Sequence, residues 1–369
     1  MPKAQETVLE IDLNALKHNF EYIKSKLQKD TKILAVVKAF AYGSHAEIIA
    51  DYLQNLDVDY FAVAYVSEGV ALRNAGIIKP ILVLHPQAVN FKTLIERCLE
   101  PSLYSSKVLH EFIAVASEEQ QNDYPIHIKF NTGLNRLGFS DNDVDHIIST
   151  LKSSKAVKAK SIFSHLAASE DLSEKEFTIQ QIQKFKSIAE NFSEKIGYQP
   201  MFHICNTSGI LNYPEAHLDM VRTGIGLYGF GNSEEENKHF KPIATLKSVI
   251  SQIHHIKKGE TVGYNRAFKS QTMVKSATIP IGHADGINRQ YGNGKGYVMI
   301  NGKPAYIIGN VCMDMIMVDV SDMDCKEGDE IIIFGPHPHS ASEFSKTAQT
   351  ISYEIITAIS TRVKRVFLT

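Results

Sequence analysis

The sequence has no tryptophan and only four cysteines in 369 residues. These four, Cys98, Cys205, Cys312 and Cys325, form no CxxC pair, which argues for reduced thiols and against a zinc site or any other metal site. No apolar run approaches the ~18 residues of a membrane-spanning helix. The start, MPKAQETVLE, lacks the apolar core of a signal peptide. The sequence therefore predicts a cytoplasmic protein with no metal and no membrane partner.

The chain also lacks an excess of charge of either sign. Its 39 lysines and arginines nearly balance 41 acidic residues, for a formal net charge of -2, so charge gives no reason to expect nucleic acid as a partner. With 44% hydrophobic and 22% charged residues, the composition is that of a globular protein. A chain of this length is long for one core and favours two domains, or a barrel with an appendage.

Short β-rich runs alternate with amphipathic helical patterns over residues 9–235. Apolar strands separated by helices indicate a parallel sheet buried on both faces. Eight such units in about 220 residues favour a (β/α)8 barrel of the TIM type. An open doubly wound sheet is the alternative, but no GxGxxG follows the first strand. The eight runs are KILAVV, YFAVAY, PILVLHP, EPSLYS, IHIKFN, KSIFSHLA, MFHICN and DMVRTGIGLYGF.

The pattern changes after residue 235. Closely spaced strands with turn signals such as KGETVG, YGNGKG and CKEGDE predict a mostly antiparallel β domain over residues 236–369. One late helix is expected in SASEFSKTAQTI. Residues 1–8, ahead of the first predicted helix, are expected to pair with this second domain.

Polar residues gather where the predicted barrel strands end, which is where barrels carry out their chemistry. Each one alone has an ordinary structural explanation, but that explanation does not predict that all fall at the same end of successive strands. A partly desolvated lysine, as Lys38 would be, has a lowered pKa and an amine able to form a Schiff base. The strand-end residues are Lys38, Lys129, Asn131, Arg136, His165, His203, Asn206, Thr207, Ser208 and Arg222.

The loops after the last two barrel strands are suited to phosphate. NTSG offers two hydroxyls and a glycine, and TGIG contains Gly224 and Gly226, which allow close backbone approach. Barrels commonly bind phosphate between these loops. A phosphate site facing a strand-end lysine fits a phosphorylated aldehyde cofactor, pyridoxal 5'-phosphate (PLP).

At this point the motifs resemble a known family. KAFAYGS is similar to the K-A-N-A-Y-G-H signature of alanine racemases, PLP enzymes built from a barrel and a β domain. KxxxYG alone is weak, but further motifs follow in the family's order along the whole chain: KFNTGLNRLGF, SHLA, HICNTSG, MVRTGIGLYG, VGYNRAF, HADGINR, GNVCMDM and ISYEI. The resemblance implies a homodimer that interconverts L- and D-alanine and supplies D-alanine for peptidoglycan.

The resemblance also implies a two-base mechanism. Lys38 would hold the cofactor and act on one face of the substrate's Cα, and the partner subunit's Tyr264 would act on the other. Arg222 would contact the pyridine nitrogen. Because arginine stays protonated, it cannot give that nitrogen a full proton, which makes the ring a weaker electron sink. His203 would orient Arg222, and His165 would pack on the ring face.

The remaining roles come from the same resemblance. Tyr42, Asn206, Thr207, Gly224, Ile225 and Tyr353 would bind the cofactor, chiefly its phosphate. Arg136 would contact both the phenolic oxygen and the substrate, and Met313 would meet the substrate carboxylate. Lys129, often carbamylated in the family, and Asp314 would support the site.

The chain departs from the family at Phe40 for Asn, His283 for Tyr, Asn310 for Arg, and Ser169-Glu170 for Ala-Asp. These departures concern the entrance and the substrate range. Tyr353 is retained, whereas relatives that handle serine have a smaller side chain there, so alanine is the expected substrate. Three alternatives remain. A related decarboxylase would use a C-terminal cysteine and a Gly-rich loop that is absent here, and a PLP-binding protein without turnover is typically a single barrel. The third alternative is an unrelated phosphate-binding barrel enzyme.

Overall fold

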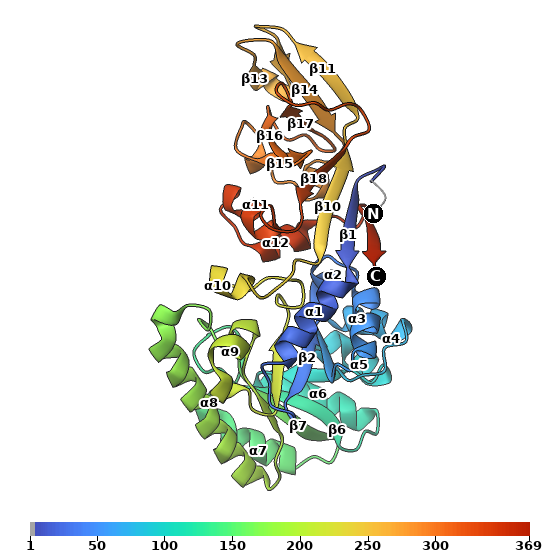
Figure 1. Ribbon diagram of the computed structural model, residues 1–369. Helices are drawn as coiled ribbons and strands as arrows, with labels where there is room; N and C mark the ends of the chain where they lie inside the picture. The colour runs from blue at the N-terminus through green and yellow to red at the C-terminus, as the bar shows by residue number, and fades with distance from the viewer. Residues whose placement is uncertain (1–3) are drawn as a thin grey trace.

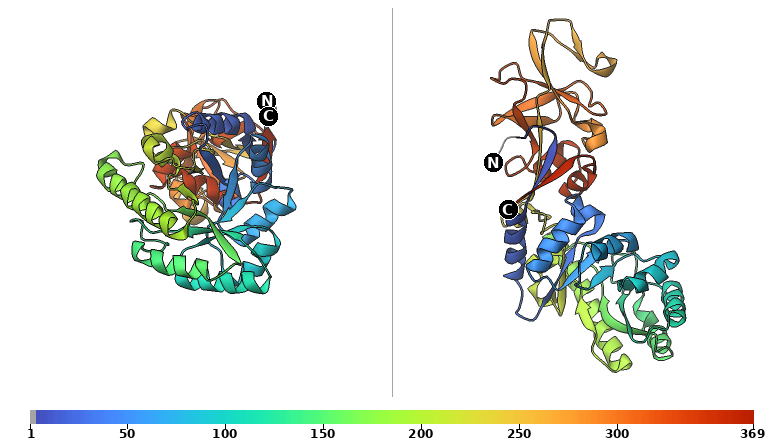
Figure 2. Two further views of the ribbon diagram at one scale, coloured as in Figure 1. Left: turned by 90° about the horizontal axis from the view of Figure 1, so that it is seen from below. Right: turned by 90° about the vertical axis from the view of Figure 1, so that its right-hand side faces the viewer.

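The computed structural model describes residues 4–369. Two lobes lie end to end, one built from the first two thirds of the chain and one from the last third (Figure 1). The view from below shows the helices of the first lobe arranged around its strands (Figure 2). No helix within residues 4–369 is long and apolar enough to cross a membrane.

The first lobe is the predicted (β/α)8 barrel. Within residues 4–369 its sheet has eight parallel strands in the order β8-β7-β6-β5-β4-β3-β2-β9. Between the edge strands, the Asp219 amide donates to the Phe202 carbonyl and the Arg222 amide donates to the Cys205 carbonyl, so the sheet closes on itself. The strands are β2 (Lys32–Val36), β3 (Tyr60–Val63), β4 (Ile81–Val83), β5 (Glu100–Leu103), β6 (Tyr124–Lys129), β7 (Val157–Phe163), β8 (Met201–His203) and β9 (Met220–Thr223).

Helices connect and cover these strands. α1 shows why they form: Asp12 accepts from the Ala15 amide at its start, and Leu16, Phe20 and Ile23 lie along one buried face. The helices of this lobe are α1 (Leu13–Lys24), α2 (Lys38–Tyr42), α3 (Ala46–Asn55), α4 (Val66–Asn74), α5 (Phe91–Glu96), α6 (Ser106–Glu118), α7 (Val144–Lys152), α8 (Lys175–Ile196), α9 (Thr207–Asn212) and α10 (Glu234–Asn237).

The second lobe is a mostly antiparallel sheet, as predicted. Its strand order is β11-β14-β17-β16-β15-β18-β10-β1-β19, and only β1 and β19 pair in parallel within the described residues. The expected late helix is α11 (Ala341–Thr347), and a second helix that was not expected, α12 (Ser352–Ala358), follows it. The strands are β10 (Ala244–Val249), β11 (Gln252–Ile256), β14 (Val274–Ile279), β15 (Tyr297–Ile300), β16 (Lys303–Ile308), β17 (Ile316–Asp319), β18 (Glu330–Phe334) and β19 (Lys364–Leu368), with a separate pair β12 (Thr261–Val262) and β13 (Phe268–Lys269).

The start of the chain belongs to the second sheet. β1 (Val8–Asp12) lies between β10 and β19, with Val8 opposite Lys247 on one side and Lys364 on the other. Residues 9–12, which were expected to begin the barrel domain, therefore belong to a strand of the second sheet. Residues 1–3 lie outside the described part, and the division at residue 235 stays a prediction.

Candidate active site

A cavity of about 380 Å³ opens at the carboxyl ends of the barrel strands. It brings together most of the side chains that the sequence placed at strand ends. The predicted residues that line it are Lys38, Tyr42, Lys129, Arg136, His165, Asn206, Thr207, Arg222, Gly224, Ile225 and Tyr353. Tyr353 comes from α12 of the second lobe, so both lobes contribute to the cavity.

Lys38 does not end a strand, contrary to expectation. β2 ends at Val36, and Lys38 opens a short left-handed turn in which four consecutive non-glycine residues, Ala39 to Tyr42, have φ between 50° and 56°. L-residues adopt this conformation at a cost of about 1–2 kcal/mol each. The turn must therefore be held by its surroundings.

Two hydrogen bonds and one close backbone approach constrain the turn. The Glu68 carboxylate accepts from the Ala39 amide at 2.7 Å, and Arg365 Nε donates to the Gly43 carbonyl at 3.0 Å. Gly43 ends the turn at φ 83°, where a Cβ would lie 2.1 Å from the Ile356 carbonyl oxygen. Two of these three constraints, from Arg365 and Ile356, come from the second lobe.

The cavity is rich in cations. Burial lowers the pKa of Lys38, and Arg136 lowers it further. Burial and the neighbouring Arg136, Arg222 and Lys38 lower the pKa of Lys129 to about 8. No carboxylate is among the lining residues in the described part of the chain. The cavity is therefore suited to an anionic ligand.

Arg222 is buried at the floor of the cavity. Its Nη1 donates to His203 Nδ1 at 2.7 Å, and its Nη2 contacts the Ser164 carbonyl at 2.7 Å, the Ile204 carbonyl at 3.0 Å and His165 Nδ1 at 3.1 Å. Burial lowers the pKa of Arg222 to about 10, which leaves the guanidinium charged near neutrality. Because of these contacts its orientation is fixed before any ligand binds.

Hydroxyl groups and a glycine surround the other end of the cavity. A Cβ on Gly224 would lie 2.4 Å from Tyr42 Oη, so only glycine leaves this space free. Thr207 Oγ1 lies 3.2 Å from Thr223 Oγ1. The Tyr353 hydroxyl donates to Asn232 Oδ1 at 3.1 Å, and burial raises the pKa of Tyr353 to about 12. These groups remain neutral donors near physiological pH.

Tyr264, Met313 and Asp314 do not join this cavity within one chain. They line a separate hollow of about 500 Å³ in the second lobe. Figure 1 shows β13, which closely follows Tyr264, at the end of this lobe away from the barrel. Tyr264 is 74% exposed and Met313 58%.

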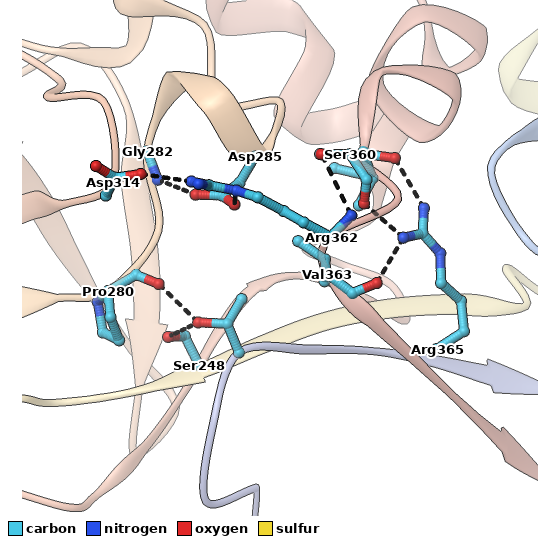
Figure 3. Close-up of polar contacts among 11 residues, drawn as sticks. Ser248, Pro280, Gly282, Asp285, Asp314, Ser360, Arg362, Val363 and Arg365 are labelled. Atoms are coloured by element: carbon cyan, nitrogen blue, oxygen red, sulfur yellow. Dashed lines mark hydrogen bonds and ion pairs between the residues drawn. The ribbon is translucent and has the colours of Figure 1, made fainter.

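Arg362 holds the loop that carries Met313 and Asp314 (Figure 3). Its Nε donates to Asp285 at 2.7 Å and its Nη2 donates to Asp314 at 2.6 Å. Asp285 also accepts from the Gly282 amide at 2.8 Å, and the Ala284 amide donates to the Met313 carbonyl at 3.0 Å. The Met313 backbone is thus fixed although its side chain is exposed.

Comparison with known proteins decides the family. Residues 11–231 match the model of the alanine racemase N-terminal domain, and residues 243–367 match that of the C-terminal domain. The chain belongs to the alanine racemase family. It is accordingly an isomerase that racemises alanine.

Named alanine racemases align with almost the whole chain. The alanine racemase of Geobacter sp. (strain M21) is 34% identical, over 99% of this chain and 99% of the relative. The solved alanine racemase of Clostridium difficile 630 is 33% identical and superposes with a TM-score of 0.93, covering 100% of this chain and 97% of that one. The Bacillus anthracis enzyme, solved with bound L-Ala-P, is 28% identical with a TM-score of 0.91, covering 100% and 96%.

Two residues that line the racemase cavity, His85 and Phe163, were not predicted from the sequence. His85 lies two residues after the end of β4 and stacks on Tyr104 with ring centroids 5.7 Å apart. Phe163 stacks on His203 at 4.8 Å. His85 could have been found, because it follows the apolar run ILVL, whereas nothing in the sequence distinguishes Phe163 from other core aromatics.

Proposed function

We propose that the cavity holds PLP and that Lys38 is its covalent anchor. The observation that carries the proposal is the partly buried, pKa-lowered amine of Lys38 in a cavity lined with cations and without carboxylates in the described residues. An amine with a lowered pKa is uncharged often enough to react with an aldehyde. The cationic lining and the space kept free by Gly224 fit a phosphate monoester.

Different parts of the cofactor would be held by different side chains. Arg222 would contact the pyridine nitrogen, His165 would pack on the ring, and Arg136 would contact the phenolic oxygen and the substrate. When bound, PLP would delocalise the negative charge that develops at the substrate's Cα. The phosphate would be held by Tyr42, Asn206, Thr207, Gly224, Ile225 and Tyr353.

We infer that two bases act on opposite faces of Cα, Lys38 on one and the partner subunit's Tyr264 on the other. One group removes the proton and the other returns it, which inverts the configuration. Tyr264 needs a second chain because, within one chain, it lines a hollow separate from that of Lys38. The exposed Tyr264, Met313 and Met315 form an apolar patch of the kind that marks an interface.

In the resulting homodimer each site uses both subunits. Met313 meets the substrate carboxylate through its backbone amide, and Asp314, fixed by Arg362, supports that loop. Lys129, if carbamylated, would carry a negative charge and support Arg136 from within the barrel. The product D-alanine is used for peptidoglycan, and the enzyme acts in the cytoplasm.

Subunit exchange tests the composite site. Lys38→Ala and Tyr264→Phe are each expected to be inactive, and their mixed dimer has one site with both changes and one with neither. Random exchange of equal amounts makes about half of the dimers mixed, so activity should recover to about a quarter of wild type per total site. Differently tagged chains establish that exchange occurred. Mixed dimers without activity would place both bases on one subunit.

Absorbance tests the anchor. On addition of PLP the wild type should gain a visible absorption band that borohydride removes, and Lys38→Ala should not. Lys32→Ala, at the exposed start of β2, the strand that precedes Lys38, is the matched control and should behave as wild type. A colourless wild-type protein in excess PLP would refute the proposed cofactor.

A further inference from the structure

A chain of buried polar side chains crosses the inside of the barrel beneath Arg222. Glu100, His127, Ser161 and His203 lie on β5, β6, β7 and β8, four neighbouring strands of the sheet. Glu100 is 6% exposed and the other three are fully buried. Polar groups inside a barrel are costly to bury unless they are hydrogen-bonded, whereas apolar side chains would pack there without that cost. Their presence therefore requires an explanation.

Each member contacts the next. Arg222 Nη1 lies 2.7 Å from His203 Nδ1, and His203 Nε2 lies 2.9 Å from Ser161 Oγ. Ser161 Oγ lies 2.5 Å from His127 Nδ1, and His127 Nε2 lies 2.7 Å from Glu100 Oε2. The chain is continuous from the cavity floor to Glu100.

The two ends fix the direction of every hydrogen bond. At one end Arg222 has only donors. At the other, Lys160 Nζ donates to Glu100 Oε1 at 2.8 Å. Burial alone would raise the pKa of Glu100, but the bonds from His127 and Lys160 outweigh it and keep the pKa below its ordinary value. Glu100 is therefore an ionised carboxylate, which only accepts.

The protons between these ends then have one arrangement. Since Arg222 donates to His203 Nδ1, the His203 proton lies on Nε2 and points to Ser161. Among residues 4–369 the Ser161 hydroxyl contacts only the two histidines, so its own proton points to His127 Nδ1. His127 then carries its proton on Nε2 and donates to Glu100. Every proton points away from Arg222.

We propose that Glu100, His127 and Ser161 are positioning residues that hold His203 as the hydrogen-bond acceptor for Arg222 and so aim the guanidinium at the cavity. What Arg222 meets there rests on the proposed function. If the hydrogen bonds were donated in the opposite direction, His203 would turn an N–H toward Arg222, and two donors would face each other in a dry core. Such unpaired contacts are unfavourable, so the guanidinium would leave its place.

Glu100→Gln tests the direction of the chain. Lys160 can only donate, so it takes the amide oxygen and leaves the amide NH2 facing His127. His127 must then accept at Nε2 and donate from Nδ1, Ser161 must donate to His203, and the His203 proton moves to Nδ1. Lys160→Met added to Glu100→Gln frees the amide oxygen to turn toward His127, which restores the original direction. Lys160→Met alone keeps the carboxylate and serves as the matched control.

The readout is the ring-nitrogen chemical shifts of His203 in full-length, histidine-15N-labelled protein, before and after PLP is added. Wild type, Lys160→Met and the double variant should show the Nε2–H tautomer, and Glu100→Gln alone should lose it. With PLP present, kcat should fall about tenfold in Glu100→Gln, as for outer-shell partners of metal-bound histidines, and recover in the double variant. An unchanged His203 signal in folded Glu100→Gln would overturn the proposal.

Ser161→Ala keeps the proposal testable if Glu100→Gln does not fold. This variant leaves His203 Nε2–H without its acceptor, so the hydrogen-bonded proton resonance of His203 should move upfield. An unmoved resonance would refute the proposed hydrogen bonds between Glu100 and Arg222. The measurements without PLP do not depend on what Arg222 contacts. A failed cofactor assignment and a failed positioning chain are thus separate results.

Discussion

Lys129→Met should change how the stability of the protein depends on pH. Lys129 is 8% exposed, and burial with nearby Arg136, Arg222 and Lys38 lowers its pKa from 10.5 to about 8. Below pH 8 the lysine is protonated in both the folded and the unfolded state, and the folded state carries the full penalty of the buried charge. Between pH 8 and 10.5 the unfolded state binds more protons, so stability rises with pH. Above pH 10.5 the amine is neutral in both states and the penalty is absent.

The size of this effect follows from the pKa difference. A change of about 2.5 pKa units corresponds to about 3 kcal/mol of unfolding free energy. Wild type should therefore gain up to about 3 kcal/mol relative to Lys129→Met between pH 7.5 and 10.5. Urea unfolding at 25 °C in CO2-free buffer, without PLP, measures the difference, and the exposed Lys152→Met is the matched control for loss of one lysine charge. A constant difference between wild type and Lys129→Met across this range would mean that no buried amine titrates there.

Three further changes test the geometry. Phe40→Asn should be more stable than Phe40→Ala by about 1 kcal/mol in urea unfolding, because both substitutions remove the ring but asparagine tolerates φ near 56° better than alanine does. Equal stability of the two variants would mean that the turn is not strained at this position. Gly224→Ala should weaken PLP binding about tenfold in an absorbance titration, because its methyl group would meet Tyr42 Oη, and an unchanged affinity would place the phosphate elsewhere. Arg362→Met should lower the unfolding free energy by about 1–3 kcal/mol, because the buried Asp285 carboxylate loses its charged partner, whereas the half-exposed pair with Asp314 contributes little. Amide exchange at residues 283 and 284 should also accelerate, and unchanged exchange would show that the loop is held without Arg362.

The barrel could be predicted because each of its strands and helices is encoded by a local pattern of apolar and polar residues. Strands buried on both faces must be apolar runs, and each of the eight quoted runs overlaps a strand of the barrel sheet. The polar residues that end those runs, such as Lys129 and His203, necessarily meet at one end of the barrel. The strand-end positions of these residues are therefore enough to predict a polar cavity at that end of the barrel.

The left-handed turn at Lys38 could not be predicted. Alanine and phenylalanine give no local signal for positive φ, and the conformation depends on Glu68, Arg365 and Ile356, contacts that no local pattern encodes. The pairing of Lys38 with Tyr264 has no sequence signal either and came only from the resemblance to a family, so it stays a prediction. What the sequence could not supply is, in both cases, contact between distant parts of a chain or between chains.

The parallel pairing of β1 with β19 joins the two ends of the chain, and Arg365 of β19 reaches back 322 residues to the carbonyl of Gly43. A ribosome delivers Arg365 322 residues after Gly43. The nascent barrel can bury its apolar strands in the meantime, but the strained turn lacks its contacts with the second lobe until β19 has been made. The conformation of Lys38 is thus completed only after the second lobe folds onto the barrel, so that chains that stop before Arg365 would hold this lysine less firmly.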